Sequence, residues 1–171
     1  MDIQVNIVNK VANSGLITFN LEDYMQKGDR ILYDIKDNLF HGLMLKEQDF
    51  RAFVKDHDWQ QYEGKNVAIY CSADAIVPTW AYMLLANRMA PYANEVVFGS
   101  LELLEAVLFT KALAKVDVNT YADQRVVIKG CGEVEIPIAA YVEITALLSP
   151  VVKSLMYGEP CSTVPIFKRK D

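Results

Sequence analysis

The stretch of sequence that decides the fold is Val67-Ala68-Ile69-Tyr70-Cys71-Ser72-Ala73-Asp74. Its first half is a short apolar run, which is typical of a strand, and its second half is a polar turn. A helix is expected after the turn and should extend to about Met89, because Pro78 is tolerated only near a helix's first turn. Residues 95–99 predict the next strand. This order of elements is typical of parallel strands joined by helices.

The same alternation continues on both sides of this stretch. Ser100 can cap a helix with an apolar stripe, residues 125–129 predict a third strand, and residues 137–148 predict a third helix. Towards the N-terminus, residues 16–19 and 30–35 predict strands and residues 47–57 a helix. We therefore predict an α/β fold: a mixed, mainly parallel sheet with helices on both faces and a β-rich N-terminal leader.

A shift of 59 residues aligns residues 62–99 with residues 121–158, and eight of the 38 aligned pairs are identical. Typical composition gives about two or three identities by chance. The shared pattern is a strand, a polar turn, a proline at the helix start and a closing aromatic-glycine pair. This pattern indicates a βα pseudo-repeat. The alternative is that any two strand–helix units have the same residue types at their turns and helix starts.

Composition favours one domain over residues 1–171, because 171 residues with 52% hydrophobic content can build a real core. The formal net charge of −5 argues against a basic surface that binds nucleic acid and against attraction to anionic membranes. No secretion signal or membrane span is evident, which predicts a cytoplasmic protein with reduced cysteines. The aromatic residues leave room for a homodimer interface.

Three cysteines, Cys71, Cys131 and Cys161, carry the most distinctive chemistry in the chain. Cys71 ends the strand of the first repeat, and Cys131 lies one residue past the equivalent point of the second. Loops at the carboxyl ends of parallel strands commonly bind ligands. Since Cys161 follows the end of the second repeat, we predict that all three thiols converge on one edge of the sheet.

Three thiolates and one further donor suit zinc, or form an incomplete ligand set for an iron–sulfur cluster. Glu159, His41 and His57 are additional donors, the two histidines being remote in sequence. The predicted metal ligands are three cysteines and two acids: Cys71, Cys131, Cys161, Asp74 and Glu133. Two alternatives stay open. The thiols pack as small apolar groups in a non-enzymatic interaction module, or one of them is the nucleophile of a thiol enzyme at a helix N-terminus.

Two further features have structural interpretations. Asp74 and Glu133 suit the first turns of their helices, where acids stabilise the helix dipole. The tail over residues 158–167 carries two prolines around Cys161, which excludes a helix or a central strand. Its apolar pair Ile166-Phe167 predicts that the tail docks on the domain.

Several segments resemble an uncharacterised bacterial family of small conserved proteins, filed as a domain of unknown function. The matching stretches include Val11-Ala12-Asn13-Ser14-Gly15-Leu16, Cys71-Ser72-Ala73-Asp74-Ala75 and Met156-Tyr157-Gly158-Glu159-Pro160-Cys161-Ser162-Thr163-Val164-Pro165. The resemblance covers nearly the whole chain but implies no assigned activity. Such proteins are associated with neighbourhoods of iron–sulfur cluster assembly genes, so the resemblance implies iron–sulfur assembly proteins as partners.

Overall fold

The computed structural model describes residues 15–130 and 132–170, which divide into two compact units. Residues 26–108 form the first, here called the three-stranded unit. The segments before residue 26 and after residue 108 together form the second, the four-stranded unit. The chain thus leaves the four-stranded unit after its first strand and returns to it within a helix. The single domain expected over residues 1–171 stays a prediction.

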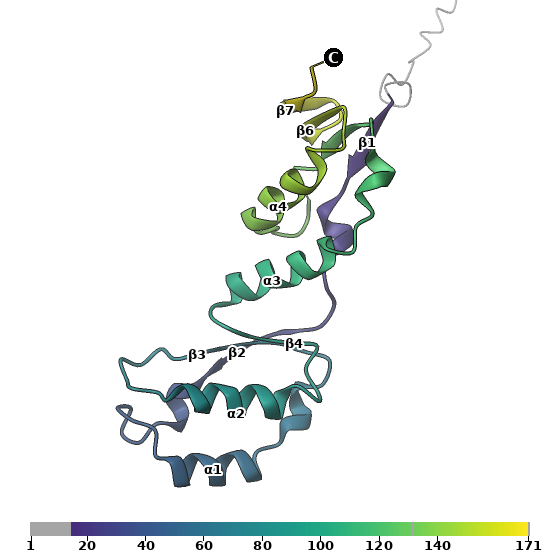
Figure 1. Cartoon of the computed structure of the whole chain (residues 1–171). Coiled ribbons are helices and arrows are strands. Elements are labelled where there is room, and N and C mark those ends of the chain that lie inside the picture. The colour runs from purple at the N-terminus through teal and green to yellow at the C-terminus, as the bar shows by residue number, and fades with distance from the viewer. Residues whose placement is uncertain (1–14, 131, 171) are drawn as a thin grey trace, which may run out of the picture. The chain divides into compact units, whose positions relative to one another are not determined.

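The three-stranded unit is a parallel sheet in the order β2 (Arg30–Asp34), β3 (Asn66–Tyr70) and β4 (Glu95–Phe98). Between β2 and β3 lie the short 3-10 helix η2 (Ile35–Asn38), the helix α1 (Glu47–Asp56) and the 3-10 helix η3 (Trp59–Tyr62). The helix α2 (Thr79–Met89) connects β3 to β4. Figure 1 shows α1 and α2 on the same side of these strands.

Alternation along β3 explains how helices cover both faces of this sheet. Val67 and Ile69 point to one face and pack with buried residues of α1 and α2, such as Leu85. Ala68 points to the other face, where it packs against Leu104 and Leu108 of α3 (Leu101–Leu113). All three strand residues are fully or almost fully buried. The continuous apolar run was therefore a correct signal for a strand covered on both sides.

The four-stranded unit has the strand order β1 (Leu16–Phe19), β5 (Arg125–Ile128), β6 (Ser154–Glu159) and β7 (Ser162–Lys168). The first three strands are parallel, and β7 returns antiparallel to β6. The helix α4 (Ile138–Leu148) joins β5 to β6. The short 3-10 helix η1 (Leu21–Tyr24) follows β1, and the 3-10 helix η4 (Val118–Tyr121) lies between α3 and β5. The core combines one face of the sheet with α4 and the end of α3: Phe19, Leu21, Phe109, Leu113, Val126, Ile128, Ala140, Ile144, Leu148, Val152 and Leu155.

The two units repeat the same local geometry at the predicted 59-residue shift. The backbone N–H of Gly64 donates to Tyr92 O at 3.0 Å, and that of Asp123 donates to Val151 O at 2.9 Å. Gly64 and Asp123 both have positive φ, +69° and +58°. Prolines stand immediately before both α2 and α4, with nearly identical extended backbone angles. The matched sequence positions therefore fold into matched structures.

The α/β fold class and the mainly parallel strands are confirmed, with two corrections of detail. The parallel strands are divided between two sheets rather than gathered in one. The first predicted strand of the β-rich leader, residues 16–19, is a strand of the four-stranded sheet, because β1 pairs with β5 over the register Leu16↔Arg125 to Phe19↔Ile128. Among the described residues, no helix is long and apolar enough to cross a membrane.

The tail forms an edge strand, as its prolines allow. Pro165 sits in β7, which has one neighbouring strand, next to a register shift between Leu155 and Met156. Edge strands and bulges are the places where a sheet tolerates proline. The predicted docking is half confirmed: Phe167 packs against the core of the unit, whereas Ile166 is exposed.

Candidate functional site

The carboxyl edge of the three-stranded sheet is organised by Asp34. Its carboxylate accepts hydrogen bonds from the backbone N–H and the hydroxyl of Ser72, at 3.1 and 2.5 Å, and from the backbone N–H of Lys36 at 3.1 Å. The Lys36 ammonium lies 3.3 Å away. Burial alone would raise the pKa of Asp34, but these hydrogen bonds outweigh it and lower the pKa to about 2. Asp34 thus ties the end of β2 to the turn that follows β3.

Cys71 lies in that turn and has a structural environment. It is half-buried, packs against the apolar cluster of the three-stranded unit, and its thiol donates to Ala73 O at 3.5 Å. Asp74 is exposed. Because α2 begins only at Thr79, with Pro78 before it, the expected role of Asp74 in the first helical turn is wrong. The same holds for Glu133, since α4 begins at Ile138.

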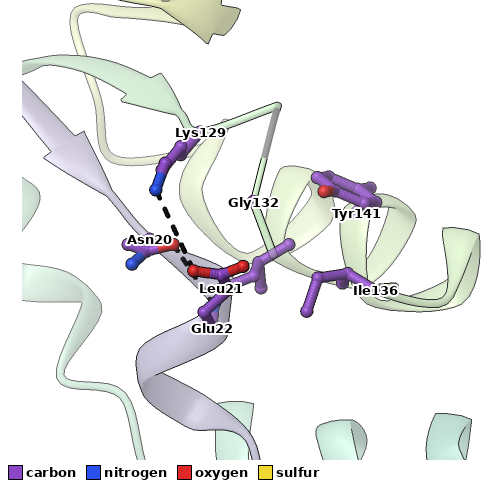
Figure 2. A pocket seen from close by; sticks show the side chains of 7 residues that line it. All are labelled: Asn20, Leu21, Glu22, Lys129, Gly132, Ile136 and Tyr141. Atoms are coloured by element: carbon purple, nitrogen blue, oxygen red, sulfur yellow. Dashed lines mark hydrogen bonds and ion pairs between the residues drawn. The ribbon is translucent and has the colours of Figure 1, made fainter. Parts of the chain in front are cut away.

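The corresponding edge of the four-stranded sheet holds a carboxylate in the same way. Figure 2 shows Glu22, from η1, facing Lys129 across a crevice, and the two charged groups lie 3.9 Å apart. Glu22 also accepts a hydrogen bond from the backbone N–H of Val134 at 3.1 Å. A β-carbon on Gly132 would overlap the Glu22 carboxylate, so this close approach requires glycine.

This crevice is too small for a substrate. Its volume is about 10 Å³, and its other lining residues include Asn20 and Tyr141. A cavity of roughly 10–15 Å³ holds about one water molecule. Glu22 and Lys129 therefore fix the turn after β5, in the way that Asp34 fixes the turn after β3.

Cys131 lies outside the described residues, but its two neighbours are described. Gly130 O accepts a hydrogen bond from the Tyr157 hydroxyl at 3.2 Å, and a β-carbon on Gly130 would approach the Tyr157 ring to 2.6 Å. Tyr157 belongs to β6, whose hairpin with β7 turns at Cys161. Cys161 is exposed. The turn after β5 and this hairpin thus share the carboxyl edge of the four-stranded sheet.

The predicted site divides accordingly. Cys71 and Asp74 follow β3 in the three-stranded sheet, whereas the turn after β5 and Cys161 belong to the four-stranded one. Within residues 15–130 and 132–170, no three His, Cys, Asp or Glu side chains gather into a metal-binding group. The predicted convergence of the three thiols assumed that all the strands belong to one sheet, whereas the described strands form two. A site that includes Cys131 stays a prediction.

Sequence reasoning missed a pocket in the three-stranded unit, here called the acidic aromatic pocket. Its volume is about 410 Å³, within the range of small-molecule sites. Its described lining combines aromatic rings, side-chain amides and two carboxylates and includes no Lys or Arg: Ile31, Leu32, Tyr33, Asp34, Asp37, Asn38, Phe53, His57, Gln61 and Tyr62. The residues come from β2, η2, η3 and the end of α1.

Hydrogen bonds and ring contacts hold the walls of this pocket. The Tyr33 hydroxyl donates to Asn38 Oδ1 at 2.7 Å. His57 Nε2 lies 3.2 Å from the Tyr62 hydroxyl and 3.0 Å from the Gln61 amide nitrogen. The His57 ring also lies near Phe53, with 4.8 Å between ring centroids. The polar groups of the wall are therefore largely positioned before any ligand arrives.

Burial sets the protonation states in the pocket. It raises the pKa of Tyr33 strongly and that of Tyr62 as well, and it lowers the pKa of His57. At neutral pH the two tyrosines are protonated and His57 is mostly neutral, whereas Asp34 is ionised. Asp34 therefore contributes negative charge to the lining, part of which the Lys36 ammonium offsets from 3.3 Å away. The helix predicted over residues 47–57 ends at Asp56 with His57 as its cap, but nothing in the sequence of that segment shows that β2 lies opposite.

Comparison with known proteins gives a family and no activity. A family model described as "Protein of unknown function (DUF2480)" matches residues 5–169. Searches of curated proteins and of solved structures found no match. The match extends over nearly the whole sequence, both units included. The chain belongs to the DUF2480 family of proteins of unknown function.

Proposed function

We propose that this protein is a non-enzymatic binding module whose three-stranded unit takes a small organic cation, such as a protonated amine, in the acidic aromatic pocket. The observation that carries the proposal is the joining of two carboxylates, Asp34 and Asp37, with aromatic rings in one cavity of about 410 Å³. Pockets with convergent polar groups and perturbed pKa values are the usual places for ligands.

Three physical effects favour a cation in this pocket. Carboxylates attract it by Coulomb interaction, and aromatic faces attract it through their quadrupole, by about 0.5–1 kcal/mol at exposed sites. The C-terminal end of α1, which is capped by His57, adds the negative end of a helix dipole. An anion would meet all three effects with the opposite sign.

The expected affinity is modest. Phenethylamine has nine non-hydrogen atoms, and at about 0.5 kcal/mol for each atom the binding free energy is about 4.5 kcal/mol, or a Kd near 0.5 mM. Asp34 is held by Ser72 and Lys36, so Asp37, which is exposed and lines the pocket, is the better residue to test.

The experiment is calorimetric titration with phenethylamine and with 3-phenylpropionate, which has similar size and opposite charge. The proposal predicts binding of the amine alone and a Kd raised about 1.5- to 5-fold in Asp37→Asn, as expected for loss of one exposed ionic contact. Asp74→Asn is the matched control, because Asp74 is an exposed acid of the same unit outside the pocket. Equal binding of both probes, or equal effects of both variants, contradicts the proposal.

A metal or iron–sulfur role of the cysteines is the second candidate, and one observation favours it. Tyr157 links the residue before Cys131 to the strand that leads to Cys161. We propose that these two cysteines, with Glu133 or Glu159 nearby in sequence, hold zinc or receive an iron–sulfur intermediate. Iron–sulfur assembly proteins would then be the partners. Thiolates and carboxylates are competent donors for zinc.

Metal analysis of protein purified anaerobically without chelator tests this second candidate. Loss of metal in Cys161→Ser and retention in Cys71→Ser supports a site on the four-stranded unit. Loss in both supports the three-cysteine site predicted from sequence. Absence of zinc and iron from the wild type contradicts both versions. Light scattering of the same samples tests the homodimer, which we propose only from the aromatic content of the chain.

A further inference from the structure

A second pocket lies in the four-stranded unit and has the opposite charge. Its volume is about 400 Å³, and we call it the basic pocket after its three cationic side chains. Its lining comes from β5, β6 and β7 and the residue before β6: Arg125, Lys153, Ser154, Met156, Pro165, Phe167 and Lys168. Every one of these residues belongs to the four-stranded unit.

The strand register explains why the cations gather. Arg125 pairs with Ser154, and Ser154 pairs with Lys168, so the three residues form one row across β5, β6 and β7. Directly opposed residues on neighbouring strands have their Cβ atoms about 4.5–5.5 Å apart. Lys153 precedes Ser154 and accepts a backbone hydrogen bond from Arg169 at 3.0 Å, which holds it beside the end of β7. Two cationic residues thus flank one serine hydroxyl in this row.

The next row supplies an apolar floor. Met156 pairs with Pro165, next to the register shift between Leu155 and Met156, and Phe167 lines the same pocket. Met156 is half-buried, and its sulfur accepts the Thr163 hydroxyl at 3.7 Å. Among the described residues, no carboxylate lines the pocket. Asp123, which is close in sequence to Arg125, forms an ion pair with Arg169.

We propose that the basic pocket binds a small amphipathic anion, a carboxylate or sulfate head on a short alkyl or aryl chain. The head would lie at the row of Arg125, Ser154 and Lys168, and the chain would cover Met156 and Pro165. The protein has a net charge of −5, whereas the described lining of this cavity carries three cationic side chains. The sign of the charge in this lining is therefore opposite to that of the protein as a whole. This inference rests on residues of the four-stranded unit and is independent of the cation site proposed in the other unit.

Calorimetry on the full chain with octanoate, acetate and octylammonium tests the proposal. Octanoate should bind, and acetate should bind at least tenfold more weakly because it lacks the chain. Any heat of octylammonium binding should be unchanged in Lys153→Gln/Lys168→Gln, because an ammonium belongs to the acidic aromatic pocket of the other unit. In Lys153→Gln/Lys168→Gln the Kd for octanoate should rise about 2- to 30-fold, as expected for the loss of two exposed ionic contacts. Lys55→Gln/Lys115→Gln is the matched control, with the same change in net charge at exposed lysines outside the pocket.

Each alternative result overturns a definite part of the inference. Undetectable octanoate binding, or equal loss in the two double variants, overturns the site. Equal affinity for acetate and octanoate overturns the apolar half of the proposed ligand. Because all four substituted lysines are exposed, both double variants are expected to fold, which circular dichroism and thermal unfolding would verify.

Discussion

Replacing Asp34 by Asn should destabilise the three-stranded unit at neutral pH and have little effect in acid. In the folded protein, Asp34 has a pKa of about 2, whereas its ordinary value is 3.8. The folded pKa is depressed, so the carboxylate stabilises the fold above pH 3.8, and this contribution is lost as the pH falls towards 2. A pKa lowered from 3.8 to about 2 corresponds to a stabilisation of at most about 2.4 kcal/mol. Solvent next to the carboxylate screens its interactions, so we expect about 1–1.5 kcal/mol.

Urea unfolding followed by tryptophan fluorescence is a suitable assay, because both tryptophans, Trp59 and Trp80, lie in the three-stranded unit. The free energy of unfolding of Asp34→Asn should fall by about 1–1.5 kcal/mol relative to wild type at pH 7, and the difference should shrink at pH 2.5. Asp37→Asn, an exposed neighbour with no hydrogen bond to the turn after β3, is the control. An equal loss at both pH values, or an equal loss in the control, would refute the role assigned to the Asp34 carboxylate.

Three further substitutions test the packing. Gly132→Ala should displace Glu22 from the turn after β5 and cost about 1–2 kcal/mol, and the cost should largely disappear in a Glu22→Ala background if the clash is its cause. Leu85→Ala, in the core between α2 and the sheet, should cost about 2–5 kcal/mol in the same urea assay; a cost below 1 kcal/mol would contradict complete burial. Gly28→Ala should cost at least about 2 kcal/mol, since Gly28 has φ +98° and a β-carbon there would overlap Gly64 O; wild-type stability would show that this backbone geometry is wrong.

Local elements were predictable because their signals lie within a few residues of one another. The run from Val67 to Tyr70 forms β3, and the prolines at 78 and 137 mark the starts of α2 and α4. The 59-residue correspondence predicted matched geometry, which the equivalent hydrogen bonds of Gly64 and Asp123 confirm. The residues that favour turns and helix starts, such as proline, act through local backbone sterics. They can therefore be recognised without knowledge of the rest of the chain.

The division into two sheets was not predictable by the same reasoning. Leu16 pairs with Arg125, a residue 109 positions later, and no local pattern marks which distant strand an edge strand will join. Residues 16–19 were predicted as a strand of an N-terminal leader. That prediction gave no sign that, along the sequence, the three-stranded unit lies between the two segments of the four-stranded unit. The expectation that Cys71 and Cys131 follow strands of the same sheet failed for this reason.

The acidic aromatic pocket shows a second limit of sequence reasoning. Tyr33 and Asp37 come from β2 and η2, whereas His57 and Tyr62 come from the end of α1 and from η3. Each residue has an ordinary explanation in its own segment, as a strand aromatic, a surface acid or a helix cap. Only the packing of α1 beside β2 brings the rings and carboxylates to one cavity.

Mapping of backbone amide chemical shifts during titration with phenethylamine tests the central claim most directly. The account predicts progressive shifts confined mainly to residues 31–38 and 53–62, which contain the lining of the acidic aromatic pocket. The corresponding titration with 3-phenylpropionate should leave these amides unchanged. Absence of shifts with the amine, or shifts confined to the four-stranded unit, would contradict the assignment of a cation site to this pocket.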